Sequence, residues 1–177
     1  ARKPNVILII WESLTAKVVS SVGGISGVTP NFDRLSEEGI LFSRCYANAD
    51  RSAGGIVALL SGYPELPKQR VIKMPTNTAN LPSLARCFND SGYITSFYYG
   101  GELEFANIRS YLRNEKFSRI IGKESFSSGD LNSKWGAHDH IVLGKLLEDL
   151  DRERGLFFSV LFTLSSHEPF EVPGQKY

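Results

Sequence analysis

The sequence predicts an α/β protein with a mostly parallel sheet and helices on both faces. Apolar strand-like runs alternate along the chain with segments of helical periodicity, which is typical of parallel sheets with crossover helices. The last run, residues 156–164, is apolar almost throughout, as expected for a strand buried on both faces. Strands beginning near Val6, Ile40, Tyr93 and Leu156 should therefore share one sheet, with their carboxyl ends at one edge.

The first strand covers residues 6–11 and is followed by a weak helix candidate over residues 13–22. A better-marked helix follows, because Thr29 is a good cap, Pro30 suits the first helical position and Gly39 suits the end. Phe32 and Leu35 would form its apolar face.

A strand over residues 40–47 precedes a helix that Ser52 opens and Gly62 ends. A further helix is expected from Asn80 and Pro82 to Gly92, followed by a strand over residues 93–99.

The next elements are a helix over residues 105–113, a short strand over residues 117–121 and an exposed polar loop over residues 122–134. Asp139 starts a clear helix with an amphipathic pattern. Its predicted apolar face consists of Leu143, Leu146, Leu147 and Leu150.

Bulk composition indicates a globular protein that does not bind nucleic acid. The 177 residues carry a net charge of +1, are 42% hydrophobic and contain no basic block. No apolar run reaches membrane-spanning length, and no signal peptide is recognisable. Both ends look cut, so we expect residues 1–177 to be the N-terminal portion of one catalytic domain.

The two cysteines are expected to be buried free thiols, with Cys45 in a strand and Cys87 in a helix. A disulfide between them is the alternative in an oxidising compartment. No C-x-x-C motif is present, which argues against a structural zinc site.

Polar groups follow several of the predicted strands. The sheet edge should collect Glu12, residues 48–52, residues 100–102 and residues 165–168. In open α/β sheets this edge is where ligands bind. The convergence favours a functional site over a set of unrelated polar ends.

Ser52 and Glu12 are the most informative pair at this edge. A hydroxyl at a strand-to-helix switch lies where backbone N–H groups and the helix dipole favour an anion. A metal held by Glu12 could lower the pKa of the Ser52 hydroxyl and so activate a nucleophile. The alternative is that Ser52 caps the helix and Glu12 is a solvated strand end.

Ordered motifs along nearly the whole chain resemble the alkaline phosphatase superfamily, and more narrowly the sulfatase-type domain of lipoteichoic acid synthases and related phosphoglycerol transferases. The matching stretches are Lys3-Pro4-Asn5-Val6-Ile7-Leu8-Ile9 with Glu12-Ser13, Thr29-Pro30-Asn31-Phe32-Asp33-Arg34-Leu35, Leu60-Ser61-Gly62-Tyr63-Pro64, Leu81-Pro82-Ser83-Leu84, Gly92-Tyr93, Phe97-Tyr98-Tyr99-Gly100-Gly101, Trp135-Gly136 and Leu164-Ser165-Ser166-His167-Glu168-Pro169-Phe170.

The resemblance implies a role for four residues. Glu12 falls on the first metal-ligand carboxylate, and Ser52 falls where the transferases carry a threonine nucleophile that also contacts the metal. His167 falls on a histidine that contacts the substrate phosphate. Trp135 would line the head-group pocket, with plain packing as the alternative. The implied cofactor is a divalent metal, Mn²⁺ first, with Zn²⁺ or Mg²⁺ as alternatives.

His138 and His140 look like a second ligand pair, but residues two apart at a helix start diverge, which argues against ligation. The resemblance also places the family's Asp-His ligand pair well beyond residues 164–170. The metal site should therefore be incomplete within residues 1–177.

One departure separates the chain from true sulfatases. Their Cys or Ser is followed by x-Pro-x-Arg and is converted to formylglycine, whereas Gly54 and Ile56 stand at those two positions here. Conversion of Ser52 is therefore not expected.

The resemblance implies an extracytoplasmic phosphoryl-transfer enzyme, on the outer face of the cytoplasmic membrane or in the periplasm. Its substrate would be a phospholipid head group or another phosphodiester, and membrane anchoring would come from segments outside this chain. The alternatives are a phosphodiesterase or sulfatase-like hydrolase of the same fold, and a non-catalytic binding domain.

Overall fold

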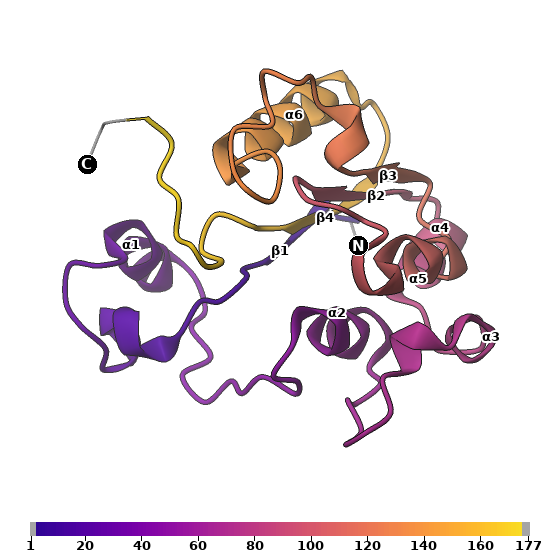
Figure 1. The fold of residues 1–177 in the computed structure, drawn as a ribbon, viewed down its shortest axis with the longest axis horizontal. Coiled ribbons are helices and arrows are strands. Elements are labelled where there is room, and N and C mark those ends of the chain that lie inside the picture. Colours follow the sequence, from indigo (N-terminus) through magenta and orange to yellow (C-terminus); the bar gives the residue numbers. More distant parts are fainter. Residues whose placement is uncertain (1–2, 175–177) are drawn as a thin grey trace. The chain divides into compact units, whose positions relative to one another are not determined.

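The computed structural model describes residues 3–174 and divides the chain into two compact units (Figure 1). One unit combines the first strand with the chain from Asn48 onward, and the other spans Ser13–Ala47.

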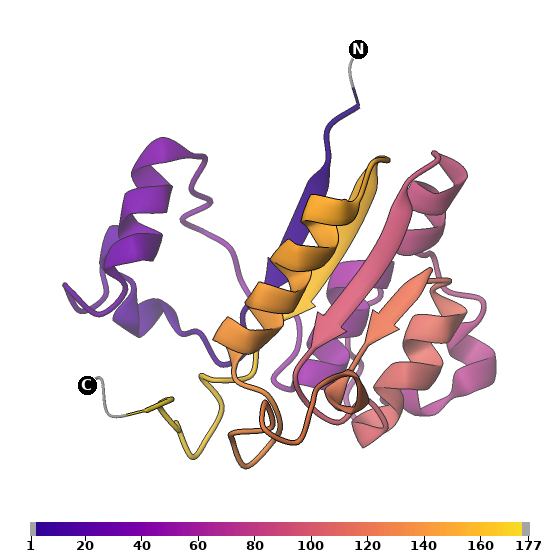
Figure 2. The same cartoon turned by 90° about the horizontal axis from the view of Figure 1, so that it is seen from above.

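The first unit is built on a four-stranded sheet in the order β1-β4-β2-β3, and every pairing is parallel. Figure 2 shows the arrowheads of the strands at the same edge of the sheet. The parallel sheet predicted from the sequence is confirmed. The strands are β1 (Val6–Ile10), β2 (Ile94–Tyr99), β3 (Arg119–Ile121) and β4 (Phe157–Phe162).

Helices cover both faces of this sheet, as predicted. In Figure 1, α6 lies on one side of the strands, and α2, α4 and α5 lie on the other. The helices of this unit are α2 (Ser52–Ser61), α3 (Pro75–Thr78), α4 (Leu84–Asp90), α5 (Ile108–Asn114) and α6 (Asp139–Arg152). Short 3-10 turns span Val71–Lys73, Phe105–Asn107 and Lys123–Ser125.

Alternate residues of the central strands feed two cores. Phe97 and Val160 are buried on the side of α2, whereas Tyr98 and Leu161 are buried on the side of α6. This alternation follows from the two-residue period of a strand. Because β4 has a neighbour on each side and helices on both faces, its apolar run is buried almost throughout.

The helix α2 is apolar on most of its surface and is packed into the larger core. Ile56, Val57 and Leu60 are each only 1% exposed. Gly62 adopts the left-handed conformation at its end, and the Gly62 N–H donates to the Ala58 carbonyl at 3.0 Å. The predicted helix and its glycine stop are confirmed.

The second unit contains little buried apolar surface and is held by local hydrogen bonds. It consists of the 3-10 turns Ala16–Val18 and Ser20–Val22 and the helix α1 (Pro30–Glu38). The Thr29 hydroxyl donates to the Val18 carbonyl, and the Asp33 carboxylate accepts from the Ser21 N–H. The hydroxyl of Ser20 and the backbone of Ser21 hold the pKa of Asp33 below its usual value.

Three sequence predictions are wrong in this unit. Residues 13–22 form two 3-10 turns rather than one helix, and Leu35 is exposed. Residues 40–47 form no strand, since Ile40 and Phe42 are 85% and 76% exposed and pair with no strand among the described residues. Their apolar composition mimics a strand, but a strand also needs a hydrogen-bonded neighbour.

Two further predictions about burial need correction. The buried face of α6 is formed by Val142 and Leu146, while Leu143 is partly exposed and Leu147 is 59% exposed. Cys45 and Cys87 are exposed free thiols, and Cys45 lies outside any strand.

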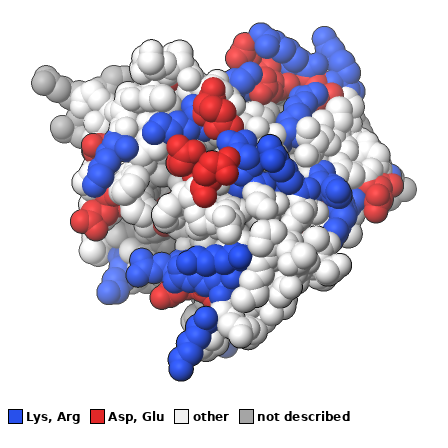
Figure 3. Space-filling model, turned by 45° about the vertical axis from the view of Figure 1, so that its right-hand side comes forward, with Lys and Arg blue, Asp and Glu red and all other residues white. Residues whose placement is uncertain are grey.

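Charged side chains of both signs lie close together on the surface. Figure 3 shows Lys and Arg side chains beside Asp and Glu side chains over much of one face. Ion pairs such as Arg109 with Glu124 (2.6 Å) and Arg119 with Glu153 (3.1 Å) contribute to this mixture. In each pair one partner is half-exposed and screened by solvent, so the contribution to stability is small, roughly 0–1 kcal/mol.

A buried carboxylate joins α2, α4 and α5. Glu115 is fully buried, and its Oε1 accepts a hydrogen bond from the Ser61 hydroxyl at 2.9 Å. The Ser61 hydroxyl also lies 2.7 Å from the Tyr111 hydroxyl. The Ser83 hydroxyl donates to the Glu115 carbonyl. Burial raises the pKa of Glu115 above its usual 4.5, because the ionised form is poorly solvated there.

Glu115 should therefore make stability fall as the pH rises. The folded state binds this proton more tightly than the unfolded state, so the stabilisation is present below pH 4.5 and is lost as pH rises through the higher folded pKa. Each unit by which the folded pKa of Glu115 exceeds its unfolded pKa corresponds to about 1.4 kcal/mol of unfolding free energy. Urea unfolding from pH 4 to pH 8 should show Glu115→Gln gaining stability relative to wild type over this range. The exposed Glu38→Gln variant is the control, and an equal slope for both variants would contradict the prediction.

Candidate active site

The carboxyl ends of β1, β4 and β2 meet at one edge of the sheet. Phe162 is in register with Ile10 on one side and with Tyr99 on the other, so the residues that follow these strands are neighbours. The Glu12 N–H donates to the Thr163 hydroxyl at 2.8 Å. Of the four segments predicted at this edge, those that follow β1, β2 and β4 are therefore neighbours, and that residues 48–52 join them stays a prediction.

Ser52 is the first residue of α2 and is half-buried, with Arg51 in the N-cap position. The first turn of a helix carries backbone N–H groups without partners inside the helix. The capping alternative for Ser52 is not supported, because the cap falls one residue earlier. That Glu12 and Ser52 share a metal ion stays a prediction of the sequence.

Tyr99 and Asp139 join this edge, and sequence reasoning missed both. The Tyr99 ring stacks on Phe162 with ring centroids 4.8 Å apart, at the end of β2. Burial raises the pKa of Tyr99 to about 12, and the negative charges of Glu12 and Asp139 add to the effect. Tyr99 therefore keeps its proton at neutral pH beside two carboxylates. Its place in the Phe97-Tyr98-Tyr99-Gly100-Gly101 motif was the available signal.

Trp135 and His167, the two predicted substrate-binding residues, are brought together by the fold. Their rings lie 5.4 Å apart in an edge-to-face arrangement. The Glu168 carbonyl accepts a hydrogen bond from Trp135 Nε1 at 2.7 Å and lies 2.8 Å from His167 Nδ1. Because a carbonyl oxygen is only an acceptor, the proton is on Nδ1, and Nε2 is the nitrogen that remains to meet a ligand.

Lys134 adds positive charge to this pair. Its ammonium lies 4.8 Å from the centroid of the Trp135 ring, which is 41% exposed. An aromatic face, a histidine and a lysine at one surface position form a group that could hold an anionic head group. A small cavity beside them is lined by Ser133, Trp135, His138, Leu164, Ser165, His167, Pro169 and Glu171.

Asp139 fixes the segment that carries His167. Its carboxylate accepts the backbone N–H groups of Leu164 (2.6 Å) and Ser165 (3.0 Å), and its own N–H donates to the Ser165 hydroxyl. The first residue of α6 therefore holds the chain at the exit of β4. The Leu164 carbonyl in turn accepts the His167 N–H at 2.9 Å.

His138 also contacts the chain that follows β4, and its position does not suit a metal ligand. It is 2% exposed, with Nδ1 2.7 Å from Asn132 Oδ1 and Nε2 3.2 Å from the Glu171 carbonyl. Both ring nitrogens thus have protein partners. The His140 ring is 6.0 Å away.

The described residues form no complete metal site. Within residues 3–174, no group of three or more His, Cys, Asp or Glu side chains is arranged to hold a metal ion. The Glu12 carboxylate and the Ser52 hydroxyl are oxygen donors of the kind that Mg²⁺ and Mn²⁺ take, but two ligands are fewer than such ions need. Glu12 and Ser52 are therefore suitable ligands for such an ion, but a stable site would need additional ones.

The fold and this edge define a class of protein. A crystal structure of a protein in the alkaline phosphatase superfamily from Vibrio parahaemolyticus matches with a TM-score of 0.91 and 33% identity, over 100% of this chain and 44% of that chain. The lipoteichoic acid synthase LtaP from Listeria monocytogenes matches with a TM-score of 0.81 and 20% identity, over 96% of this chain and 42% of that chain. This protein therefore has the alkaline phosphatase superfamily fold, as the motifs indicated.

Within this class, the chain belongs to the sulfatase family, because the family model described as Sulfatase matches residues 4–177. A Delta 4,5-hexuronate-2-O-sulfatase of Bacteroides thetaiotaomicron is 29% identical over 131 residues, covering 70% of this chain and 27% of that protein. Phosphoglycerol transferase I of Escherichia coli is 26% identical over 179 residues, covering 94% of this chain and 23% of that protein. The chain spans about a quarter of the length of these curated relatives.

A zinc complex is known for a more distant relative of the same fold. The C-terminal periplasmic domain of EcEptC from Escherichia coli, in complex with Zn, matches with a TM-score of 0.71 and 16% identity, over 98% of this chain and 47% of that chain. Zinc is thus present in one structure of this fold. In the part of this chain that the structure describes, no helix is both long enough and apolar enough to cross a membrane.

The 177-residue chain should bind Mn²⁺ and Zn²⁺ weakly or not at all, because two oxygen donors are too few for a stable site. Calorimetric titration of the chain with each ion is the measurement. Tight stoichiometric binding that survives Glu12→Ala would contradict the prediction and would point to a site elsewhere, with His138→Ala and His140→Ala as the variants to locate it.

Proposed function

We propose that the full-length protein is a metal-dependent phosphoryl-transfer enzyme that acts on a phosphodiester, with Ser52 as the nucleophile. The observation that carries the proposal is the place of Ser52 in the first turn of α2, in a chain whose sheet edge also presents Glu12 and the Trp135–His167 pair. A hydroxyl at a helix N-terminus lies in a field that favours the charge of a bound phosphoryl group.

Two positions in α2 favour phosphoryl over sulfuryl chemistry. Ile56 occupies the place of the arginine of the formylglycine signature, and its side chain is 1% exposed in the apolar core. Gly54 occupies the place of the proline, and a side chain there would overlap the Glu65 carboxylate.

Ser52 is the nucleophile in the proposed reaction. The Ser52 oxygen attacks phosphorus, an Oγ–P bond forms and the P–O bond to the leaving alcohol breaks. The proton that the hydroxyl loses is balanced by the one that the leaving alkoxide takes up. Water or an acceptor hydroxyl then cleaves the Oγ–P bond and restores Ser52.

The remaining residues bind and orient. His167 would meet a phosphoryl oxygen through Nε2, and Trp135 would cover the head group. Glu12 and Ser52 would be the ligands that this chain gives to the divalent metal, Mn²⁺ first and Zn²⁺ or Mg²⁺ as alternatives. When bound, such an ion would neutralise charge on the transferred group.

The proposed substrate is a glycerophospholipid head group or a similar phosphodiester at an extracytoplasmic membrane surface. The support is the likeness to a phosphoglycerol transferase and a lipoteichoic acid synthase, together with the periplasmic origin of the EptC domain. Anchoring would come from segments outside this chain.

A hydrolase of the same fold is the second candidate. The sequence likeness to a hexuronate sulfatase favours it, and water in place of an acceptor hydroxyl would turn the proposed transfer into hydrolysis. A non-catalytic binding domain is the third candidate, and loss of turnover in a Ser52 variant separates it from both enzymes.

Substitution of Ser52 tests the proposal in the full-length protein. Ser52→Ala should abolish turnover of a glycerophosphodiester and change the unfolding free energy by less than about 1 kcal/mol. Ser52→Thr should keep substantial activity, because it keeps the hydroxyl. Ser52→Cys should gain no aryl sulfatase activity, because Gly54 and Ile56 remove the modification signal.

The measurements are turnover of a phosphodiester and of an aryl sulfate, with mass spectrometry of the peptide that carries Ser52 to detect its phosphate ester. The exposed Ser128→Ala variant controls for loss of a hydroxyl elsewhere. Robust sulfatase turnover in wild type, or full phosphodiesterase activity in Ser52→Ala, would overturn the role of Ser52.

A further inference from the structure

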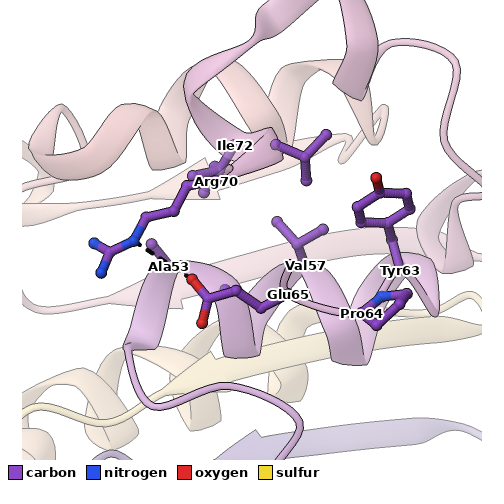
Figure 4. Close-up of a pocket in the computed structure, with 9 residues that line it drawn as sticks. Ala53, Val57, Tyr63, Pro64, Glu65, Arg70 and Ile72 are labelled. Carbon is purple, nitrogen blue, oxygen red and sulfur yellow. Dashed lines mark ion pairs between the residues drawn. The ribbon is translucent and has the colours of Figure 1, made fainter. Parts of the chain in front are cut away.

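A carboxylate lies against the first turn of α2, two residues beyond Ser52. A Cβ atom on Gly54 would come within 2.5 Å of the Glu65 Cδ atom and within 2.7 Å of both carboxylate oxygens. Real Cβ atoms essentially never show such distances, so a side chain at position 54 would require the Glu65 carboxylate, the flexible end of its side chain, to move away. Figure 4 shows Glu65 beside this turn, next to Ala53.

The chain after α2 is arranged to deliver Glu65 to this position. Gly62 reverses the chain in the left-handed conformation, and Tyr63 and Pro64 lead back along the helix (Figure 4). The Glu65 N–H then donates to Asn48 Oδ1 at 3.0 Å. Asn48 belongs to the segment that enters α2, so this bond ties the entry of the helix to the segment that follows it.

The Glu65 side chain is largely buried and is not there as a solvated surface charge. It is 13% exposed, and Arg70 Nε lies 3.4 Å from its Oε1, which accepts no hydrogen bond from the described residues. The surrounding pocket is lined by Ala53, Gly54, Val57, Tyr63, Pro64, Arg70, Val71 and Ile72. A carboxylate in such surroundings is stabilised by its cation partner and by the positive end of the helix.

We propose that Glu65 is a positioning residue which, by packing on Gly54, fixes the first turn of α2 and so the Ser52 hydroxyl. The inference rests on the proposed function only for its effect on catalysis. It also gives the Gly54 departure a physical reason, because a proline at position 54 and the Glu65 carboxylate would claim the same space.

The adjacent glycine offers a matched control within the same turn. A Cβ on Gly55 would meet nothing within 4 Å. Gly55→Ala should therefore raise the thermal midpoint by about 2–4 °C through helix propensity, whereas Gly54→Ala should raise it less or lower it, because the Glu65 carboxylate must move away from the helix. Adding Glu65→Ala to Gly54→Ala should recover the midpoint, because the overlap is then gone. A Gly54→Ala midpoint equal to that of Gly55→Ala would overturn the packing.

Hydrogen exchange tests the positioning without any assay of activity. Glu65→Ala should speed exchange in a peptide covering residues 52–57, and Glu65→Gln, which keeps the shape, should leave it close to wild type. Unchanged exchange in Glu65→Ala would overturn the proposal, even if the full-length protein proves to have no phosphodiester activity.

Kinetics of the full-length protein complete the test. Glu65→Ala and the Gly54→Ala/Glu65→Ala pair should each lose about 100-fold in kcat with KM nearly unchanged, since a misplaced nucleophile costs roughly that factor. Glu65→Gln should keep kcat within a few-fold. A double variant that recovers both midpoint and kcat would show that Glu65 only fills space. Absence of turnover in wild type would instead refute the proposed function and leave the exchange result to decide the role of Glu65.

Discussion

The site of this protein depends on the parallel pairing of β1 with β4, two strands about 150 residues apart in the chain. This pairing places Ile10 beside Phe162, so the segments after the two strands leave the sheet together. The Glu12 N–H can then reach the Thr163 hydroxyl, and the β2 end joins them through the next ladder. Without the long-range register, Glu12 would be an isolated carboxylate at the end of an apolar strand.

Around this edge, hydrogen bonds to the backbone fix the side chains that could meet a substrate. The Asp139 carboxylate holds the chain at the exit of β4, and the Glu168 carbonyl joins Trp135 to His167. Such bonds set which histidine nitrogen carries the proton and which one can meet a ligand. The orientation of these side chains is therefore set by backbone groups and by a residue, Asp139, that need not contact the substrate.

The helix that carries Ser52 departs from the sulfatase pattern at one position that also affects packing. Its apolar surface anchors it under the sheet, and Gly54 admits a carboxylate where sulfatases place a proline. The same substitution that removes the formylglycine signature thus opens space for a contact on the first turn. At position 54 the lack of a side chain has two effects. It removes the proline of the formylglycine signature, and it leaves room for the Glu65 carboxylate.

The sequence by itself determined the parallel α/β architecture and the bounds of α2, because periodicity and glycine stops are local signals, and its ordered motifs led to the proposal of Glu12, Ser52, Trp135 and His167 as site residues. Burial depends on neighbours distant in the chain. For that reason residues 40–47 looked like a strand but have no strand partner among the described residues, and Leu147 looked buried but is exposed. Only the tertiary structure showed that Tyr99 lies beside two carboxylates, that Trp135 contacts His167 and that Glu65 packs against Gly54. These contacts join segments that no local sequence pattern relates.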